Sequence, residues 1–263
     1  MNRPTGRRIL QDATRVIASN MRARAASSQH AAVWTASLAG VALVMVITWP
    51  AGAVEPQKPQ TEVACWMLYA TLVIATLLAS GYSSGRTSSF RALSITEWVR
   101  HTAVSPAGLV AGQLGDAWIM SCLFLVSTAP FFLVAFQLGA LSAAELASGL
   151  GFIVAVLVPF SVAGLASRVL IEGQDPSSLA LDAYLVAVLV ATALLPGTWA
   201  SLNPVIALAD VIHRSPRPGP VLGSVRLPGW LVAVAANSLV SVALCSLSVR
   251  RLSRRRKGGP KNA

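Results

Sequence analysis

Charged residues are scarce in this sequence, and the acidic ones are the scarcest. Only 12% of the 263 residues are Asp, Glu, Lys or Arg, whereas a soluble domain carries about 25%. So low a charge content excludes a surface that water covers on every side. Several apolar runs of about 20 residues are each long enough to cross a hydrocarbon core of about 30 Å as a helix. Because these runs are continuous rather than alternating, we expect membrane helices and not a β-barrel.

Motifs for catalysis and metal binding are missing from the sequence as well. There is no G-x-x-x-x-G-K-[ST] loop and no H-E-x-x-H pair. The three histidines are far apart, and the three cysteines fall inside apolar runs, so neither type forms a ligand cluster or a disulfide framework. Gly81 to Gly85 matches G-x-S-x-G, but an apolar helix and not a strand precedes it, which favours simple helix termination. We therefore expect no enzyme, no metal and no cofactor bound by this chain.

The apolar runs predict an all-α polytopic membrane protein whose transmembrane domain covers residues 32–249. Its six predicted helices lie at about 32–49, 63–81, 114–138, 146–170, 179–199 and 229–249. Ala51-Gly52-Ala53 resembles a signal-peptidase site, which would make the first run a cleaved leader. The basic region before this run is long for a signal peptide, so we expect a retained membrane helix.

Basic residues gather at the two ends of the chain, in residues 1–31 and 250–263, and the net charge is +11. A basic tail could bind nucleic acid. Next to membrane spans, however, Lys and Arg mark the cytoplasmic side, so we expect no nucleic-acid partner. Six spans would place both termini together in the cytoplasm.

The segment from Arg7 to His30 predicts an amphipathic helix at the membrane interface. Apolar residues recur there at helical spacing, namely Ile9, Leu10, Ala13, Val16, Ile17 and Met21. The apolar side of this helix would face the acyl chains, while Arg15, Arg22 and Arg24 would lie among anionic lipid headgroups. The alternative is a disordered basic leader.

The polar loop before the third predicted span predicts two helices that meet at a turn. Ser94 to Glu97 has the pattern of a capped helix start, and a short amphipathic helix to about His101 would follow. Ser105-Pro106 then begins a helix that continues through Gly112 into the span, since Ser suits a cap and Pro a first turn. Such a pair could form a knob that docks into a soluble partner, or it could be an ordinary solvated loop.

Few charges fall near membrane depth. Asp116 and Asp182 lie at the predicted starts of the third and fifth spans, where the helix dipole favours an acid. Asn237 lies inside the sixth and could hydrogen-bond to another helix. No series of carboxylates or basic groups lies within the predicted spans, which argues against an ion-coupled transporter and an intramembrane enzyme.

Several segments resemble the ABC-2 type transporter permeases, the membrane subunits of a class of ATP-binding-cassette exporters. That family shows a cytoplasmic segment of the form G-T-L-E-x-L-L-x-T-P-L-S, then a glycine-lysine pair leading into a span. The matching segments here are Thr96-Glu97, Thr102 to Pro106, Gly112 to Leu114, Ala129-Pro130 with Gly139, Gly164 to Ser167, and Asn203-Pro204. The chain departs from the pattern where Ala103 replaces Pro, where Gln113 replaces Lys, and where Glu97 lies one residue nearer the T-x-x-S-P element.

This resemblance implies a non-catalytic, multi-pass subunit of an exporter in the bacterial inner membrane. Two permease subunits, identical or paralogous, would bind two copies of a separate P-loop ATPase that holds ATP and Mg²⁺. The residues implied in coupling to the ATPase are Thr96, Glu97, Trp98, Arg100, Thr102, Ser105 and Pro106. Those implied in structure or gating are Gly112, Pro130, Gly164, Ser167, Asn203 and Pro204. The alternative is a non-transporting assembly factor or sensor with basic cytoplasmic tails and no ATPase partner.

Overall fold

The computed structural model describes residues 6–49, 61–84, 102–137, 141–171, 200, 202–213, 218–222 and 225–257. Within these ranges the chain forms seven helices and two short strands. In chain order they are α1 (Gly6–Ala25), α2 (Ser28–Thr48), α3 (Thr61–Ser83), α5 (Pro106–Gln137), α6 (Ala143–Ile171), α8 (Pro204–Ile212), β1 (Pro218–Leu222), β2 (Val225–Pro228) and α9 (Gly229–Lys257).

Five of these helices, α2, α3, α5, α6 and α9, are long and apolar enough to cross a membrane. They coincide with five of the six predicted spans, and the expectation of a helical, multi-pass membrane protein is confirmed. The remaining span, at about 179–199, lies outside the described residues, so the number six stays a prediction.

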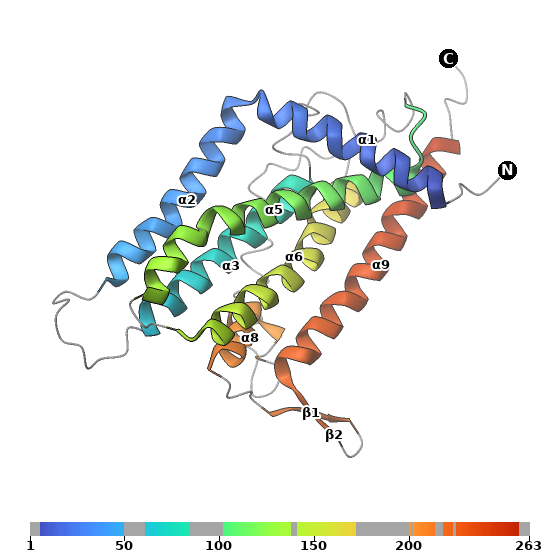
Figure 1. Cartoon of the computed structure of the whole chain (residues 1–263). Helices are drawn as coiled ribbons and strands as arrows, with labels where there is room; N and C mark the ends of the chain where they lie inside the picture. Colours follow the sequence, from blue (N-terminus) through green and yellow to red (C-terminus); the bar gives the residue numbers. More distant parts are fainter. Residues whose placement is uncertain are drawn as a thin grey trace.

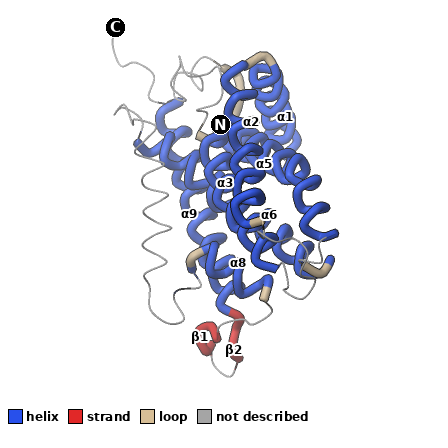
Figure 2. The backbone as a smooth tube through the Cα atoms, turned by 90° about the vertical axis from the view of Figure 1, so that its left-hand side faces the viewer, coloured by secondary structure: helices blue, strands red, loops and turns tan. Residues whose placement is uncertain are grey.

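Helices α2, α5 and α6 pack on α3, and α9 packs on α6 and α5. Helix α1 lies across one end of the long helices (Figure 1). Helix α8 and the β1-β2 hairpin lie at the opposite end (Figure 2). The face of α3 that carries Met67, Leu68, Ala75 and Ala79 is buried, and α3 contacts α2, α5, α6 and α8. Helices α2 and α9 leave most of their apolar surface exposed, as membrane-facing helices require.

The chain turns between α1 and α2 at Ala26 and Ser27. Ser27 has an extended backbone, and its side-chain oxygen accepts a hydrogen bond from the backbone N–H of His30 at 3.3 Å. A serine in this role caps the start of a helix. The interfacial helix that we expected up to His30 therefore ends at Ala25, and His30 belongs to the first span.

Helix α5 begins at Pro106 and continues without a break to Gln137, as Ser105-Pro106 predicted. Ser105 is its cap, since its hydroxyl oxygen accepts a hydrogen bond from the backbone N–H of Gly108 at 3.1 Å. Asp116 consequently lies in the third turn of α5 and not at a helix start. The macrodipole explanation for Asp116 was wrong, because the helix begins well before the apolar run.

The connection before α9 contains a short helix and a hairpin. Asn203 caps α8, its side-chain oxygen accepting hydrogen bonds from Val205 N and Ile206 N at 2.9 and 3.3 Å. Helix α8 buries Ala207, Leu208 and Ile212 and packs on α3, α6 and α9. The Pro- and Gly-rich stretch that follows forms an antiparallel hairpin in which Val221 pairs with Arg226. The helical fold thus carries two short strands in this stretch.

Candidate functional site

Helix α1 packs closely on the first turns of α5, because α5 presents glycine to it. A Cβ atom on Gly112 would lie 2.6 Å from Val16 Cβ and 3.0 Å from the Ala13 carbonyl oxygen, and one on Gly108 would collide with Asp12. Gly115, one turn further on, faces Ile17. Small residues at this spacing let two helix backbones approach closely, so the stripe on α5 forms the seat for α1.

One end of this seat is held by Asp12. Its Oδ2 accepts hydrogen bonds from both the backbone N–H and the hydroxyl of Ser105, at 2.9 and 2.7 Å. Burial raises the pKa of Asp12, but these two bonds and the positive charges of Arg8 and Arg15 outweigh burial and hold the pKa below its ordinary value. Asp12 is therefore ionised near neutral pH and ties α1 to the residue that caps α5.

The other end is held by a buried ion pair between Arg24 and Asp116. Arg24 Nη1 donates to Asp116 Oδ1 at 3.0 Å, and Nη2 lies 2.6 Å from Oδ2. Asn20 donates to the same carboxylate at 3.0 Å and to Gln113 Oε1 at 3.3 Å. Arg24 and Asp116 are 2% and 0% exposed. A charge-assisted hydrogen bond, a second close contact between opposite charges and a further donor together offset part of the cost of burying two charges.

Aromatic side chains complete the surroundings of Arg24. Its guanidinium lies over the ring of Tyr82, 4.4 Å from the centroid, an arrangement that attracts a cation. His30 contacts both Tyr82 and Trp34, with ring centroids 5.7 and 5.6 Å apart. Burial lowers the pKa of Arg24, while Asp116 and Tyr82 oppose that shift. The expected place of Arg24 among lipid headgroups was wrong, because Asp116 and Tyr82 supply its partners inside the protein.

We call this arrangement the α1-α5 joint, defined by Asp12, Asn20, Arg24, Ser105, Gln113 and Asp116. It fixes the start of α5 to α1 at two points about three turns apart. Through Tyr82 and His30 it also reaches the end of α3 and the start of α2. The joint therefore connects the cap of α5 with α1, α2 and α3.

A second close contact joins α3 to α6 at the same end of the molecule. A Cβ on Gly164 would collide with the Ser80 carbonyl oxygen and with the Ser83 hydroxyl. Arg168, one turn later, donates to the Ser84 carbonyl oxygen at 2.7 Å. A cation that binds the last carbonyls of a helix stabilises its end, so Arg168 fixes the end of α3.

Four of the predicted coupling residues lie outside the described residues, and three lie within them. Thr96, Glu97, Trp98 and Arg100 lie outside the described residues. Thr102 lies just before α5, Ser105 caps it, and Pro106 is its first residue.

The predicted structural residues lie in separate places. Gly112 belongs to the α1-α5 joint, and Pro130 lies within the last turns of α5. Gly164 makes the contact between α3 and α6, and its carbonyl accepts a hydrogen bond from Ser167 at 2.8 Å. Asn203 and Pro204 start α8 at the far end. These residues thus form no single cluster.

Of the polar members of the joint on α1, sequence reasoning missed Asp12 and Asn20 and placed Arg24 among lipid headgroups instead. Asp12, Asn20 and Arg24 recur at helical spacing on the same side of the helix as Ala13 and Val16. A polar series aligned with an apolar stripe indicates a helix that packs against protein and not against lipid. That alignment was the signal that could have found them.

In the described part of the chain, no group of three or more His, Cys, Asp or Glu side chains lies close enough together to hold a metal ion. No family model, no curated protein and no solved structure matches this chain.

Proposed function

We propose that the chain is the membrane subunit of an ABC-2 type transporter, driven by a separate P-loop ATPase. The observation that carries this proposal is the attachment of Ser105. The segment resembling the family's coupling element ends at Ser105-Pro106, where α5 begins. Asp12 holds Ser105 with two hydrogen bonds. A motion of this segment would therefore act directly on a helix of 32 residues and on α1.

The proposed mechanism is mechanical. Closure of the ATPase on ATP and Mg²⁺ would move the segment from about Ile95 to Pro106. The α1-α5 joint would carry that motion to α1 and α2, and α5 would carry it across the membrane. Two permease subunits, identical or paralogous, would pair to form the export path. Because the spans lack a charged lining in the sequence, an amphipathic cargo is favoured.

The proposed orientation follows from charge. Helix α1 and the end of α9 lie at the same end of the long helices (Figure 1), and the basic ends of the chain lie there. Lys and Arg next to spans favour the cytoplasm. We place this end, with Ser105, on the cytoplasmic side of a bacterial inner membrane, where the ATPase is found.

Replacement of residues 102–106 by a flexible Gly-Ser linker tests the mechanism. The variant should still insert into the membrane, but ATPase activity linked to transport should be lost. The matched control replaces residues 219–223 in the hairpin region with the same linker and should retain the activity. Unchanged transport-linked ATPase activity in the 102–106 variant would refute the coupling role.

The second candidate is a non-transporting assembly factor or sensor, and the exposed arginines of α1 are the observation that favours it. It requires no ATPase, and the basic ends would bind anionic lipid or a regulator. A gene for a lone P-loop ATPase beside the gene for this chain would favour the transporter. The absence of an ATPase from the purified native assembly would favour the sensor.

A further inference from the structure

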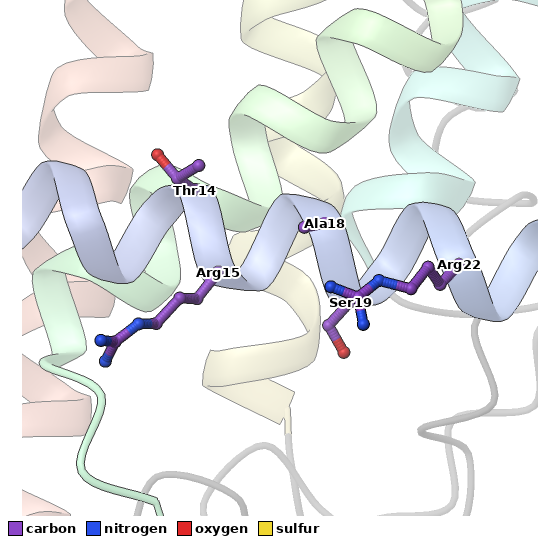
Figure 3. A pocket seen from close by; sticks show the side chains of 5 residues that line it. All are labelled: Thr14, Arg15, Ala18, Ser19 and Arg22. Carbon is purple, nitrogen blue, oxygen red and sulfur yellow. The ribbon is translucent and has the colours of Figure 1, made fainter.

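The outer face of α1, opposite the α1-α5 joint, carries a row of arginines. Arg8, Arg15 and Arg22 recur every seventh residue, which is nearly two turns of a helix, and all three are exposed. Arg15 and Arg22 project from one side of α1, with Ala18 and Ser19 between them (Figure 3). We call Arg8, Arg15 and Arg22 the arginine row.

The row borders a shallow, open depression with a volume of about 380 Å³, lined by Thr14, Arg15, Ala18, Ser19 and Arg22. Two guanidinium groups flank it, and Ser19 adds a hydroxyl. Guanidinium groups and hydroxyls are the donors that bind phosphate oxygens well. The small side chain of Ala18 leaves the space between the arginines open to a group of that size.

The charge of this face is positive along its whole length. Asp12 is the only acidic residue before Glu55 in the sequence. It lies one turn from Arg8 and Arg15 and offsets part of their charge, but its carboxylate is bound to Ser105. The end of α9 adds Arg250, Arg251 and Arg254 nearby, since Leu252 packs in the same apolar cluster as Val16. An anionic partner is therefore favoured along α1.

Exposed apolar side chains on α1 favour a phospholipid as the anionic partner. Leu10 and Met21 lie on a different side of α1 from the arginine row, with Thr14 and Ala18 between the two sets at helical spacing, and they are 69% and 38% exposed. Helix α1 itself lies across the end of the long apolar helices (Figure 1), and a membrane crossed by these helices would have its headgroups near that end. A helix with apolar and basic sides at this depth is suited to phospholipid. A soluble anion would gain nothing from Leu10 or Met21.

We propose that the arginine row of α1 is a binding site for the phosphate groups of anionic phospholipids, with Leu10 and Met21 against their acyl chains. The site differs from the interfacial helix expected from sequence, because Arg24, Ala13 and Val16 face the protein. It requires only that α1 lies at the membrane surface, and it does not rest on the proposed transporter function. Bound lipid would hold α1, and with it the joint, at the membrane surface.

The test uses the full-length protein in a neutral detergent. Dioleoyl phosphatidylglycerol is titrated in, and the midpoint of thermal unfolding is followed, with dioleoyl phosphatidylcholine as the uncharged lipid. The anionic lipid should raise the midpoint, and the uncharged lipid should not. The variant R8Q/R15Q/R22Q should lose up to about a hundredfold in apparent affinity for phosphatidylglycerol, since each arginine near an anionic surface contributes about fivefold. High salt should weaken the wild-type response.

Two controls keep the result specific. R214Q/R217Q/R226Q removes the same number of charges from the connection before α9 and should respond like the wild type. Sodium phosphate at matched concentration distinguishes a free anion from a lipid and should leave the midpoint unchanged. Equal responses of R8Q/R15Q/R22Q and the wild type to phosphatidylglycerol would overturn the proposal, and so would a full response to phosphate alone. If R8Q/R15Q/R22Q does not elute as a single species, the single variants R15Q and R22Q replace it, each with an expected loss of about fivefold.

Discussion

The guanidinium of Arg24 holds the carboxylate of Asp116 with both of its terminal nitrogens, although the two residues lie 92 positions apart in the chain. Asn20 donates to the same carboxylate, and the ring of Tyr82 lies beneath the guanidinium. These contacts make α1 a packed element of the membrane protein. They also tie it to the helix whose first residue ends the proposed coupling segment.

The ion pair predicts that removing one partner alone reduces the free energy of unfolding more than removing both partners together. Asp116→Leu alone leaves a buried cation without its anion and should reduce the free energy of unfolding by about 3–5 kcal/mol. The double variant Arg24→Met with Asp116→Leu should recover most of that loss, because an apolar pair can replace a buried ion pair. Unfolding of the purified protein in detergent measures both effects.

Arg22→Met is the matched control for this pair. It removes a positive charge two residues before Arg24, from a side chain that is exposed and not buried. Its effect should stay within about 0.5 kcal/mol. If Asp116→Leu and Arg22→Met proved equally mild, the ion pair would not hold α1 on α5.

The glycine seat predicts opposite outcomes for two alanine substitutions. Gly112→Ala forces a methyl group against Val16 and the backbone of Ala13 and should destabilise the protein by about 1–3 kcal/mol. Gly151→Ala in α6, where a Cβ meets nothing within 4 Å, should instead stabilise it by about 0.5–1 kcal/mol. Thermal unfolding of the two variants side by side checks the signs. A neutral Gly112→Ala would mean that α1 does not approach α5 this closely.

The sequence was sufficient for those features of the fold that depend on local patterns. Hydrophobic runs located α2, α3, α5, α6 and α9, because length and composition alone decide whether a helix can cross a membrane. The caps at Ser105 and Asn203 were also predictable, since each places a hydrogen-bonding side chain before a proline, which is favoured at the first position of a helix.

The partners of the polar residues could not be predicted in this way. Periodicity shows that Arg24 and Asn20 share a side of α1, but it does not show that the side faces Asp116. Interfacial lipid and buried protein both accept an arginine on an amphipathic helix, so local pattern cannot choose between them. The hairpin was missed for a different reason, because its strands are short and contain three prolines, Pro218, Pro220 and Pro228.

Asp12 predicts how the stability of the joint depends on pH. Its folded pKa lies below its ordinary value, so the ionised carboxylate favours the folded state. This contribution is fully present above the unfolded pKa of about 4 and is lost as the pH falls through the lower, folded pKa. Asp12→Asn should therefore unfold at a lower temperature than the wild type near neutral pH.

The difference between the wild type and Asp12→Asn isolates this group from the other acids, which titrate in both proteins. The gap in unfolding temperature should shrink as the pH is lowered below about 4. A gap that stays constant down to pH 3, or that widens there, would contradict an ionised Asp12 at the joint.

The arrangement of the spans predicts which positions share a side of the membrane. Helices α6 and α9 run in the same direction and both end near α1 (Figure 1), so six spans require one further crossing between them. In a background with Cys65, Cys122 and Cys245 replaced by alanine, single cysteines at Gln11 and Arg254 should be labelled only from the cytoplasmic side. A cysteine at Ala144 should be labelled only from outside. Labelling of Gln11 and Arg254 from different sides would refute the topology.

The most direct test of the central proposal is to purify the tagged protein in mild detergent from its native host and to identify what accompanies it. The transporter account predicts a P-loop ATPase in a one-to-one ratio with this chain. It also predicts that the ATPase is lost from the variant in which a Gly-Ser linker replaces residues 102–106, while this variant remains in the membrane. An intact, well-expressed membrane protein that carries no ATPase would contradict the account and favour the assembly-factor or sensor function.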